Sequence, residues 1–178
     1  MTTQVLIIPG IGNSGPEHWQ SRWQTHQPQC RRVEQRDWDH PVALEWQAAL
    51  EQAVAESGPD TVLVAHSLGC LLVANWAAVS QHKVRAALLV AAPDPTGPAF
   101  PTEAVGFAPV AMQPLPFASI VVSSDDDPYS SPDFAKNCAD AWGSQLATVG
   151  AAGHINADSG LGDWPEGFEL LQSLIRTG

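Results

Sequence analysis

The stretch that decides the fold runs from Thr61 to Ala78 and reads TVLVAHSLGCLLVANWAA. A β-branched apolar run is followed by Ala65-His66-Ser67-Leu68-Gly69 and then by Ala and Leu at helical spacing. This order of strand, sharp turn and helix is typical of a nucleophile elbow, which places a serine hydroxyl at the end of a strand. The turn needs small residues two positions before and after the serine. Ala65 and Gly69 are small, although glycine is usual at both positions.

Ser67 is therefore the candidate nucleophile. The elbow would direct the backbone N–H of Leu68, at the N-terminus of the next helix, toward the point where an oxyanion forms. A five-residue match is weakly specific by itself, because a serine that merely begins a helix after a strand gives the same pattern. The interpretation depends on whether an acid and a histidine follow at suitable places.

A candidate base follows the last predicted strand. Residues 145–149 read as a short strand that leads to Gly153 and His154. Parallel sheets place their chemistry at the carboxyl ends of strands, so His154 would lie near Ser67 and accept its proton. Considered alone, a histidine beside a glycine turn is more often a surface residue, but the elbow and the acid loop together favour a base.

A candidate acid follows the strand predicted over residues 118–123, which runs into Asp125, Asp126, Asp127 and Pro128. One of these carboxylates would hold the second ring nitrogen of the histidine. Asp127 is the first choice because Pro128 restricts it to an extended conformation, and Asp126 is the alternative. The same carboxylates could instead serve as turn residues or as caps of the following helix.

A glycine-rich loop, PGIGNSGPEHW over residues 9–19, follows the first predicted strand. Glycines let the backbone come close to a ligand. We expect the N–H of Ile11 to be the second oxyanion donor, with Gly12 and Asn13 as alternatives, and we expect Gly12 and Asn13 to contact substrate. Glycines at this spacing also occur in dinucleotide sites, but Pro9 at the start of the loop departs from that motif.

Several aromatic side chains could either line the substrate pocket or pack in the core. His18 follows the glycine loop and could cap a helix or face the substrate. Trp38, after the second predicted strand, could shape the pocket or staple the entry to the next helix.

Residues 93–116 contain seven prolines and interrupt the regular pattern. Long irregular segments in compact domains are usually functional or disordered.

Three apolar residues of this proline-rich segment are candidates for the wall of the substrate pocket. They are Phe100, Phe107 and Met112. The alternative is that the segment only covers the sheet and that these side chains pack against it.

Strands and helices otherwise alternate along the chain. Helices are predicted over residues 16–27, 41–57, 68–80, 131–142 and 164–177. Strands are predicted over residues 4–8, 31–34, 61–65, 84–91, 118–123 and 145–149. This alternation indicates one α/β domain over residues 1–178, a three-layer αβα sandwich with a mostly parallel six-stranded sheet and no large cap domain.

The composition limits the class of protein. The chain has 178 residues, 44% of them hydrophobic and 15% charged, and a formal net charge of −11. So negative a surface disfavours nucleic acid and anionic membranes as partners. The N-terminus shows no basic leader, and we expect a cytoplasmic protein. The chain has three cysteines, Cys30, Cys70 and Cys138. Their spacing fits neither a metal site nor a framework of disulfides, and we expect no metal and no cofactor.

Together these motifs resemble the small serine hydrolases related to retinoblastoma-binding protein 9, a compact branch of the α/β-hydrolase superfamily. The resemblance extends from Val5 to the final predicted helix. It is carried by the loop over residues 9–19, the elbow, the Ser-Asp-Asp-Asp-Pro loop and Gly153-His154. It implies the strand order 2-1-3-4-5-6 and, as the acid, the aspartate immediately before the proline, Asp127.

The sequence therefore predicts a serine hydrolase that cleaves a small ester, thioester or amide through an acyl-enzyme on Ser67, with Asp127 and His154 completing a triad. The alternative is an interaction protein that keeps the hydrolase fold and binds a protein partner with little or no turnover. Retention of all three residues favours catalysis on a small acyl substrate. A chain without a cap domain is expected to have a shallow site.

Overall fold

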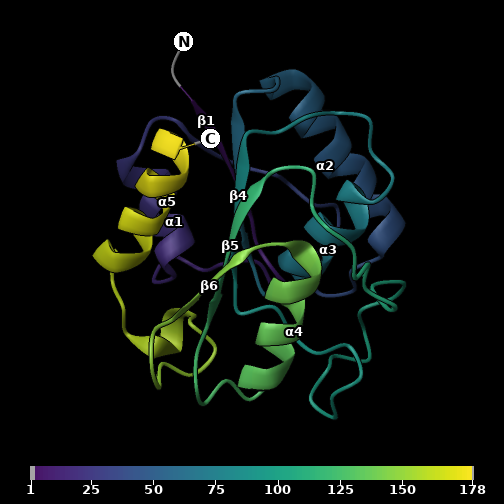
Figure 1. Cartoon of the computed structure of the whole chain (residues 1–178), viewed down its shortest axis with the longest axis vertical. Coiled ribbons are helices and arrows are strands. Elements are labelled where there is room, and N and C mark those ends of the chain that lie inside the picture. The colour runs from purple at the N-terminus through teal and green to yellow at the C-terminus, as the bar shows by residue number, and fades with distance from the viewer. Residues whose placement is uncertain (1–2, 178) are drawn as a thin grey trace.

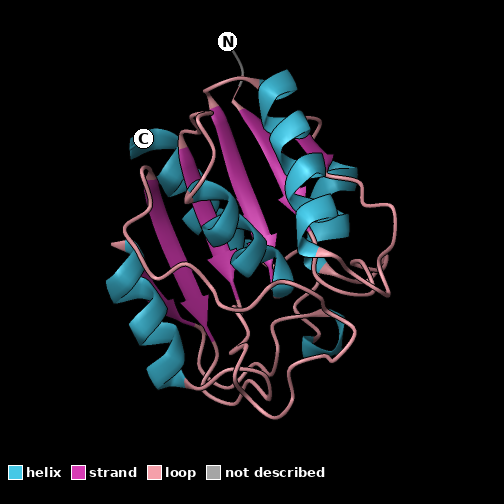
Figure 2. Cartoon of the chain, turned by 90° about the vertical axis from the view of Figure 1, so that its right-hand side faces the viewer, coloured by secondary structure: helices cyan, strands magenta, loops and turns pink. Residues whose placement is uncertain are grey.

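The computed structural model describes residues 3–177, in which a six-stranded sheet lies between two layers of helices (Figure 1). Every pair of neighbouring strands is parallel, and the strand order is β2-β1-β3-β4-β5-β6. This result confirms the order and the fold class expected from the sequence. Figure 2 shows the strand arrows pointing the same way, so the carboxyl ends of all strands meet at one edge.

Every predicted strand and helix is present. The strands are β1 (Gln4–Ile8), β2 (Cys30–Arg32), β3 (Thr61–His66), β4 (Ala86–Val90), β5 (Ala118–Ser123) and β6 (Gln145–Thr148). The helices are α1 (Trp19–His26), α2 (Ala43–Ser57), α3 (Leu68–Ala77), α4 (Pro132–Trp142) and α5 (Pro165–Thr177), with a short 3-10 helix η1 (Ala157–Ser159) that the sequence did not predict. None of the helices described between residues 3 and 177 has the length and apolar character needed to cross a membrane.

Most elements differ from the predicted ranges by only a few residues at their ends. The ends that differ most, by three residues each, are the end of α3, predicted at residue 80 and found at Ala77, and the start of α1, predicted at residue 16 and found at Trp19. At α1 the reason is local: His18 has extended backbone and caps the helix, so the turn before it remains outside. Propensity and periodicity do not fix such ends, because capping side chains decide where the first helical hydrogen bond forms.

The two faces of the sheet carry two separate cores, and alternate strand residues contribute to each. In β3, Leu63 and Ala65 face the core that α2, α3 and α4 cover. Val62 and Val64 face the core that α1 and α5 cover. Figure 1 shows α1 and α5 together on one side of the sheet and the other three helices on the opposite side. Burial on both faces explains why the strands read as continuous apolar runs.

A cluster of tryptophans connects α1 to the chain that follows β6. The indole ring of Trp19 lies 4.7 Å from that of Trp23 and 4.9 Å from that of Trp164, measured between ring centroids. The Trp19 indole N–H donates to the carbonyl oxygen of Ile155 at 2.8 Å. The loop after β6 is therefore fixed by a helix that lies far away in sequence.

The proline-rich segment is anchored to α2. Val105 forms backbone hydrogen bonds with Pro41 and Ala43, both of 2.9 Å. Phe107 is fully buried, and its ring lies 5.6 Å from that of Trp46. This part of the segment covers the sheet and its helices, as the second of the two interpretations expected.

Gly69 allows α3 to pack closely on the end of β1. A Cβ added at this position would lie 2.5 Å from the carbonyl oxygen of Ile8, which is backbone and cannot move aside cheaply. We predict that Gly69→Ala lowers the free energy of unfolding by about 1–3 kcal/mol, measured by urea denaturation. Gly15→Ala is the matched control, because no atom lies within 4 Å of its added Cβ. Equal losses in the two variants would contradict this account.

Candidate active site

Ser67 lies in a strained backbone conformation between β3 and α3. Its φ is 54° and its ψ is −125°, a region that costs a residue with a side chain about 1–3 kcal/mol. The conformation is held by the Ser67 N–H, which donates to the carbonyl oxygen of Val90 at 2.9 Å. Only 9% of the residue is exposed. The turn directs the hydroxyl to the carboxyl edge of the sheet, as a nucleophile elbow does.

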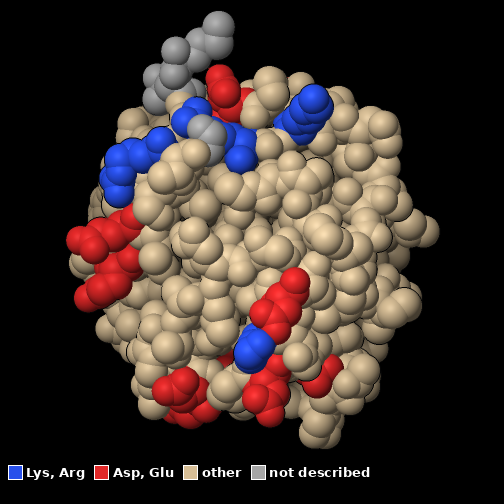
Figure 3. All heavy atoms as spheres, viewed as in Figure 1, with Lys and Arg blue, Asp and Glu red and all other residues tan. Residues whose placement is uncertain are grey.

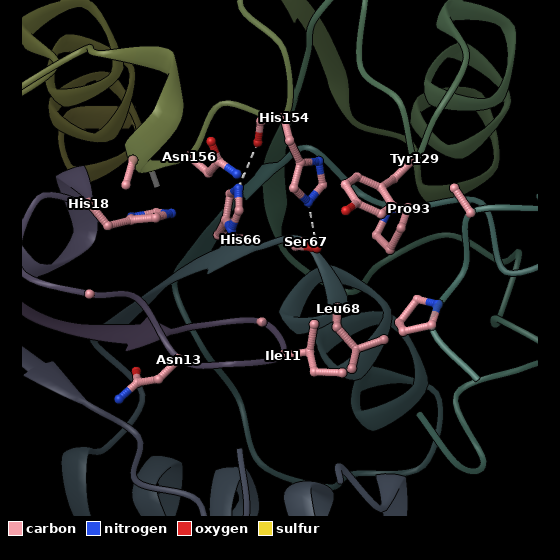
Figure 4. A pocket seen from close by; sticks show the side chains of 15 residues that line it. Ile11, Asn13, His18, His66, Ser67, Leu68, Pro93, Tyr129, His154 and Asn156 are labelled. Atoms are coloured by element: carbon pink, nitrogen blue, oxygen red, sulfur yellow. Dashed lines mark hydrogen bonds between the residues drawn. The ribbon is translucent and has the colours of Figure 1, made fainter. Parts of the chain in front are cut away.

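Three side chains form a continuous set of hydrogen bonds at this edge. Oγ of Ser67 lies 2.8 Å from Nε2 of His154, and Nδ1 of His154 lies 2.9 Å and 3.0 Å from the two carboxylate oxygens of Asp127. A carboxylate can only accept, so Nδ1–H is the donor, and Nε2 is left to accept from the serine hydroxyl. Figure 4 shows the His154 ring directed at Ser67. The Asp127 side chain is 2% exposed and that of His154 is 10% exposed.

The neighbouring aspartates have different contacts. Asp126 accepts from the N–H of Gly153 at 2.7 Å and from the hydroxyl of Ser124 at 2.9 Å, so it connects the acid loop to the histidine loop. The Gly153 N–H, followed by the Ser124 hydroxyl, lowers the pKa of the Asp126 carboxyl. Asp125 accepts from the hydroxyl of Thr148 at 3.2 Å. Asp127, rather than the alternative Asp126, is the carboxylate that the structure places against the imidazole.

Two backbone N–H groups beside Ser67 are available to an oxyanion. Across residues 3–177, neither the N–H of Leu68 nor that of Ile11 donates to another protein group, and both residues line the cavity. The alternatives Gly12 and Asn13 are already engaged: the Gly12 N–H donates to Trp38 at 2.8 Å and the Asn13 N–H to Gly10 at 3.2 Å. Ile11 is therefore the one of the three whose N–H remains available.

Ser67 opens into a cavity of about 370 Å³, within the range typical of small-molecule sites. Of the predicted pocket residues, Asn13 and His18 line it. His18 combines both interpretations offered for it, because it also caps α1 through Nδ1, which accepts from the Gln20 N–H at 3.1 Å.

The other predicted wall residues lie elsewhere, which corrects the sequence interpretation. Trp38 packs on Trp46, with ring centroids 5.4 Å apart. Phe100 packs against the core beneath α2 and α3, and Phe107 is buried in that core. Met112 is 45% exposed and outside the cavity. Gly12 is also absent from the wall, since its backbone turns toward Trp38. Hydrophobic side chains in an irregular segment gain as much by packing on helices as by lining a site, and sequence does not separate the two outcomes.

The sequence interpretation missed His66, Tyr129 and Asn156, which line the cavity. His66 donates from Nε2 to the carbonyl oxygen of His154 at 2.9 Å. A signal for this side chain existed: strand residues alternate between faces, so His66 points to the same face of the sheet as Val64, toward α1.

Four rings form one wall of the cavity in the order Tyr129, His154, His66 and His18. Successive ring centroids are 4.5 Å, 4.9 Å and 4.6 Å apart. Burial lowers the pKa of His18 to about 3, with smaller contributions from the charge of Arg32 and from His154. Burial also lowers the pKa of His66 well below its usual value, helped by His18 and His154. Both flanking imidazoles are therefore neutral at ordinary pH.

Comparison with known proteins gives consistent similarities. A family model described as serine hydrolase matches residues 5–173. A protein described as a YdeN-like hydrolase from Pectobacterium atrosepticum is 30% identical, with 97% of this chain and 90% of that chain covered and a TM-score of 0.85. The ydeN gene product from B. subtilis is 22% identical, with 99% and 100% covered and a TM-score of 0.79, which shows the same fold. No curated protein matches in sequence.

The two buried histidines predict how stability depends on pH. Unfolded His18 has a pKa of 6.5, whereas the folded value is about 3, so below about pH 6.5 only the unfolded state gains this proton. Stability should fall as pH decreases, by up to about 1.4 kcal/mol per pH unit for each buried histidine. Urea denaturation of the wild type and of His18→Asn between about pH 7 and about pH 5 should show a shallower slope in the variant.

His26→Asn provides the control for this measurement, because it makes the same change at the end of the same helix, where the side chain is 56% exposed. The slope should change more in His18→Asn than in this control. A slope in His18→Asn that is as steep as in the wild type would contradict the assignment of His18 as a buried neutral imidazole.

Proposed function

The chain belongs to the serine hydrolase family, and from this we propose that it hydrolyses a small ester, thioester or amide through an acyl-enzyme on Ser67. The observation that carries the proposal is the hydrogen-bonded set of Ser67, His154 and Asp127, with 2.8 Å between serine Oγ and imidazole Nε2. A nucleophile, a base and an acid that orients the base are the three groups that a Ser-His-Asp triad uses for this reaction.

In the first half of the reaction, Oγ of Ser67 attacks the substrate carbonyl while Nε2 of His154 takes the hydroxyl proton. The carbonyl oxygen becomes an oxyanion that accepts from the N–H groups of Leu68 and Ile11. When the tetrahedral intermediate collapses, His154 returns the proton to the leaving alcohol, thiol or amine, and the acyl group stays on Ser67. Water then attacks the acyl-enzyme with His154 again as base, releasing the acid and restoring the serine hydroxyl.

Asp127 has two tasks in this scheme. Its carboxylate keeps the proton of neutral His154 on Nδ1, so that Nε2 faces the serine as an acceptor. It also stabilises the imidazolium that forms while the proton is in transit. Because the Asp127 side chain is 2% exposed, this charge acts where water screens it little.

The base is positioned by contacts from the first half of the chain. His66 holds the carbonyl of His154 at 2.9 Å, and Trp19 holds the carbonyl of Ile155 at 2.8 Å. Two consecutive carbonyls are thus fixed by β3 and α1. Rigid placement of the base supports catalysis, because proton transfer requires the reacting atoms to lie within hydrogen-bond reach.

The substrate is proposed to be a small molecule without strong negative charge. The cavity of about 370 Å³ is small, and the formal net charge of −11 disfavours anions, nucleic acid and anionic membranes. On the face drawn in Figure 3, basic side chains gather mainly at the upper end of the view, and several acidic ones lie near the lower end. We further propose kinship with the retinoblastoma-binding protein 9 group, on the basis of the sequence motifs, and a cytoplasmic location.

Ser67→Ala tests the proposal most directly. The variant should lose covalent labelling by a fluorophosphonate, and kcat on an activated ester should fall by about 10⁴ or more, with little change in folding stability. Ser123→Ala is the control, since Ser123 is another mostly buried serine at the end of β5 and should remain labelled. Labelling that persists in Ser67→Ala would refute the proposed nucleophile, and an unlabelled wild type would refute the function.

The three aspartates provide a matched series of Asp→Asn variants. Asp127→Asn should lower kcat by about 10⁴, because an amide favours the wrong tautomer of His154. Asp126→Asn should cost much less, since its amide oxygen can still accept from Gly153 and Ser124. Asp125→Asn should be nearly neutral. Steady-state kinetics on one ester compares all three, and a larger loss in Asp126→Asn than in Asp127→Asn would transfer the acid role to Asp126.

A further inference from the structure

We infer that His18 is a substrate-binding residue whose Nε2–H donates to an uncharged oxygen of the substrate, such as a carbonyl, ether or hydroxyl oxygen beside the bond that is cleaved. The inference rests on the proposed hydrolase function and specifies which small substrates the same site accepts. According to this inference, one end of the cavity binds an oxygen of the substrate and the other end binds an apolar group.

The position of the His18 proton follows from its hydrogen bonds. Nδ1 accepts from the backbone N–H of Gln20 at 3.1 Å, so a neutral ring carries its proton on Nε2. Gln20 is itself buried, and its side-chain amide donates to the carbonyls of Ile8 and Val64 at 3.3 Å and 3.0 Å. The start of α1 is therefore attached to β1 and β3, and the imidazole has a fixed orientation.

Nε2 of His18 is a buried atom that forms no hydrogen bond with any residue from 3 to 177. The residue is 4% exposed and lines the cavity that contains Ser67. A buried donor without an acceptor is unfavourable, and most such groups in proteins are satisfied. Nε2 itself is closed off from the cavity in the structure, so an oxygen of a bound substrate would supply the missing acceptor after the wall beside Nε2 shifts to admit it.

The charges around His18 favour oxygen over a cationic group. Arg32 contributes to the low pKa of His18, and the groups that accept from its guanidinium are the side chains of Asn13, Ser21 and Gln24 and the carbonyl of Ser14. In the described part of the chain, no carboxylate lies within 4.0 Å of Arg32, and the more distant Glu34 offsets only part of its charge. The positive charge of Arg32 disfavours an ammonium group beside His18 and favours an electron-rich oxygen.

The opposite end of the cavity is less polar. Figure 4 shows His18, His66 and Asn156 on one side of Ser67, and Pro93 and Tyr129 on the other. Ala99 and Pro101 also line the cavity and add hydrocarbon to its wall. A substrate that spans both ends thus carries an oxygen on one side of its scissile bond and an apolar group on the other.

Two matched pairs of esters test this inference. Nitrophenyl methoxyacetate and nitrophenyl butanoate differ by an oxygen in place of a methylene in the acyl chain. Methoxyethyl acetate and butyl acetate differ in the same way in the alcohol. The ratio of kcat/KM within each pair, compared between wild type and variant, cancels the intrinsic reactivity of the esters.

His18→Asn removes Nε2, while the asparagine side chain can still cap α1. In one of the two pairs, the variant should lose about 10-fold more kcat/KM on the oxygen-bearing ester than on its hydrocarbon partner. The pair that responds shows whether the acyl group or the alcohol lies beside His18. His26→Asn makes the same change at an exposed position of α1 and should leave both ratios unchanged.

Ratios that stay within about twofold of the wild type in both pairs, in a variant that is still labelled at Ser67, would overturn the inference. Failure of the hydrolase proposal looks different, because the wild type would then be neither labelled nor active. His18→Ser, which also has a strong capping side chain, gives the same test if His18→Asn does not fold.

Discussion

Ser67 is held with φ at 54°, and the rest of the site depends on the surroundings that enforce this conformation. Its N–H is bound to β4, and the glycine loop lies so close that a Cβ on Gly10 would be 2.9 Å from the Cβ of Ser67. The same Cβ would lie 3.2 Å from the backbone nitrogen of Leu68, so the glycine loop packs directly on the elbow, and Ile11 lines the same cavity as Ser67 and Leu68. The tight turn therefore explains both why the Ser67 hydroxyl faces the cavity and why residue 10 is a glycine.

The positions of the base and the acid follow from the parallel sheet. All strands end at one edge, so loops after β3, β5 and β6 meet although their residues lie far apart in sequence. Topology alone brings them only near one another. The final placement comes from hydrogen bonds between loops, such as the one from the Gly153 N–H to Asp126, which holds the histidine loop against the acid loop.

Sequence patterns predicted the elements, their order and their parallel arrangement, because apolar periodicity and the order of strands and helices are properties of the chain itself. The basis in the sequence for choosing Asp127 over Asp126 as the acid was weaker. The two are neighbours just before Pro128, and only the geometry of the loop shows which of them contacts the imidazole. The pocket walls were predicted least well. Phe107 satisfies the same hydrophobic preference by packing on Trp46 as it would by lining a cavity, and composition does not distinguish the two.

The neutral state of the two flanking histidines has a chemical consequence. In the proposed reaction His154 becomes positively charged, and the His66 ring lies only 4.9 Å from it. A second positive charge at that distance would oppose proton transfer from Ser67, because like charges disfavour each other strongly in a poorly solvated site. Burial keeps the pKa of His66 and of His18 low, so neither carries that charge. The wall of rings can therefore hold and orient the loop of His154 without competing for its proton.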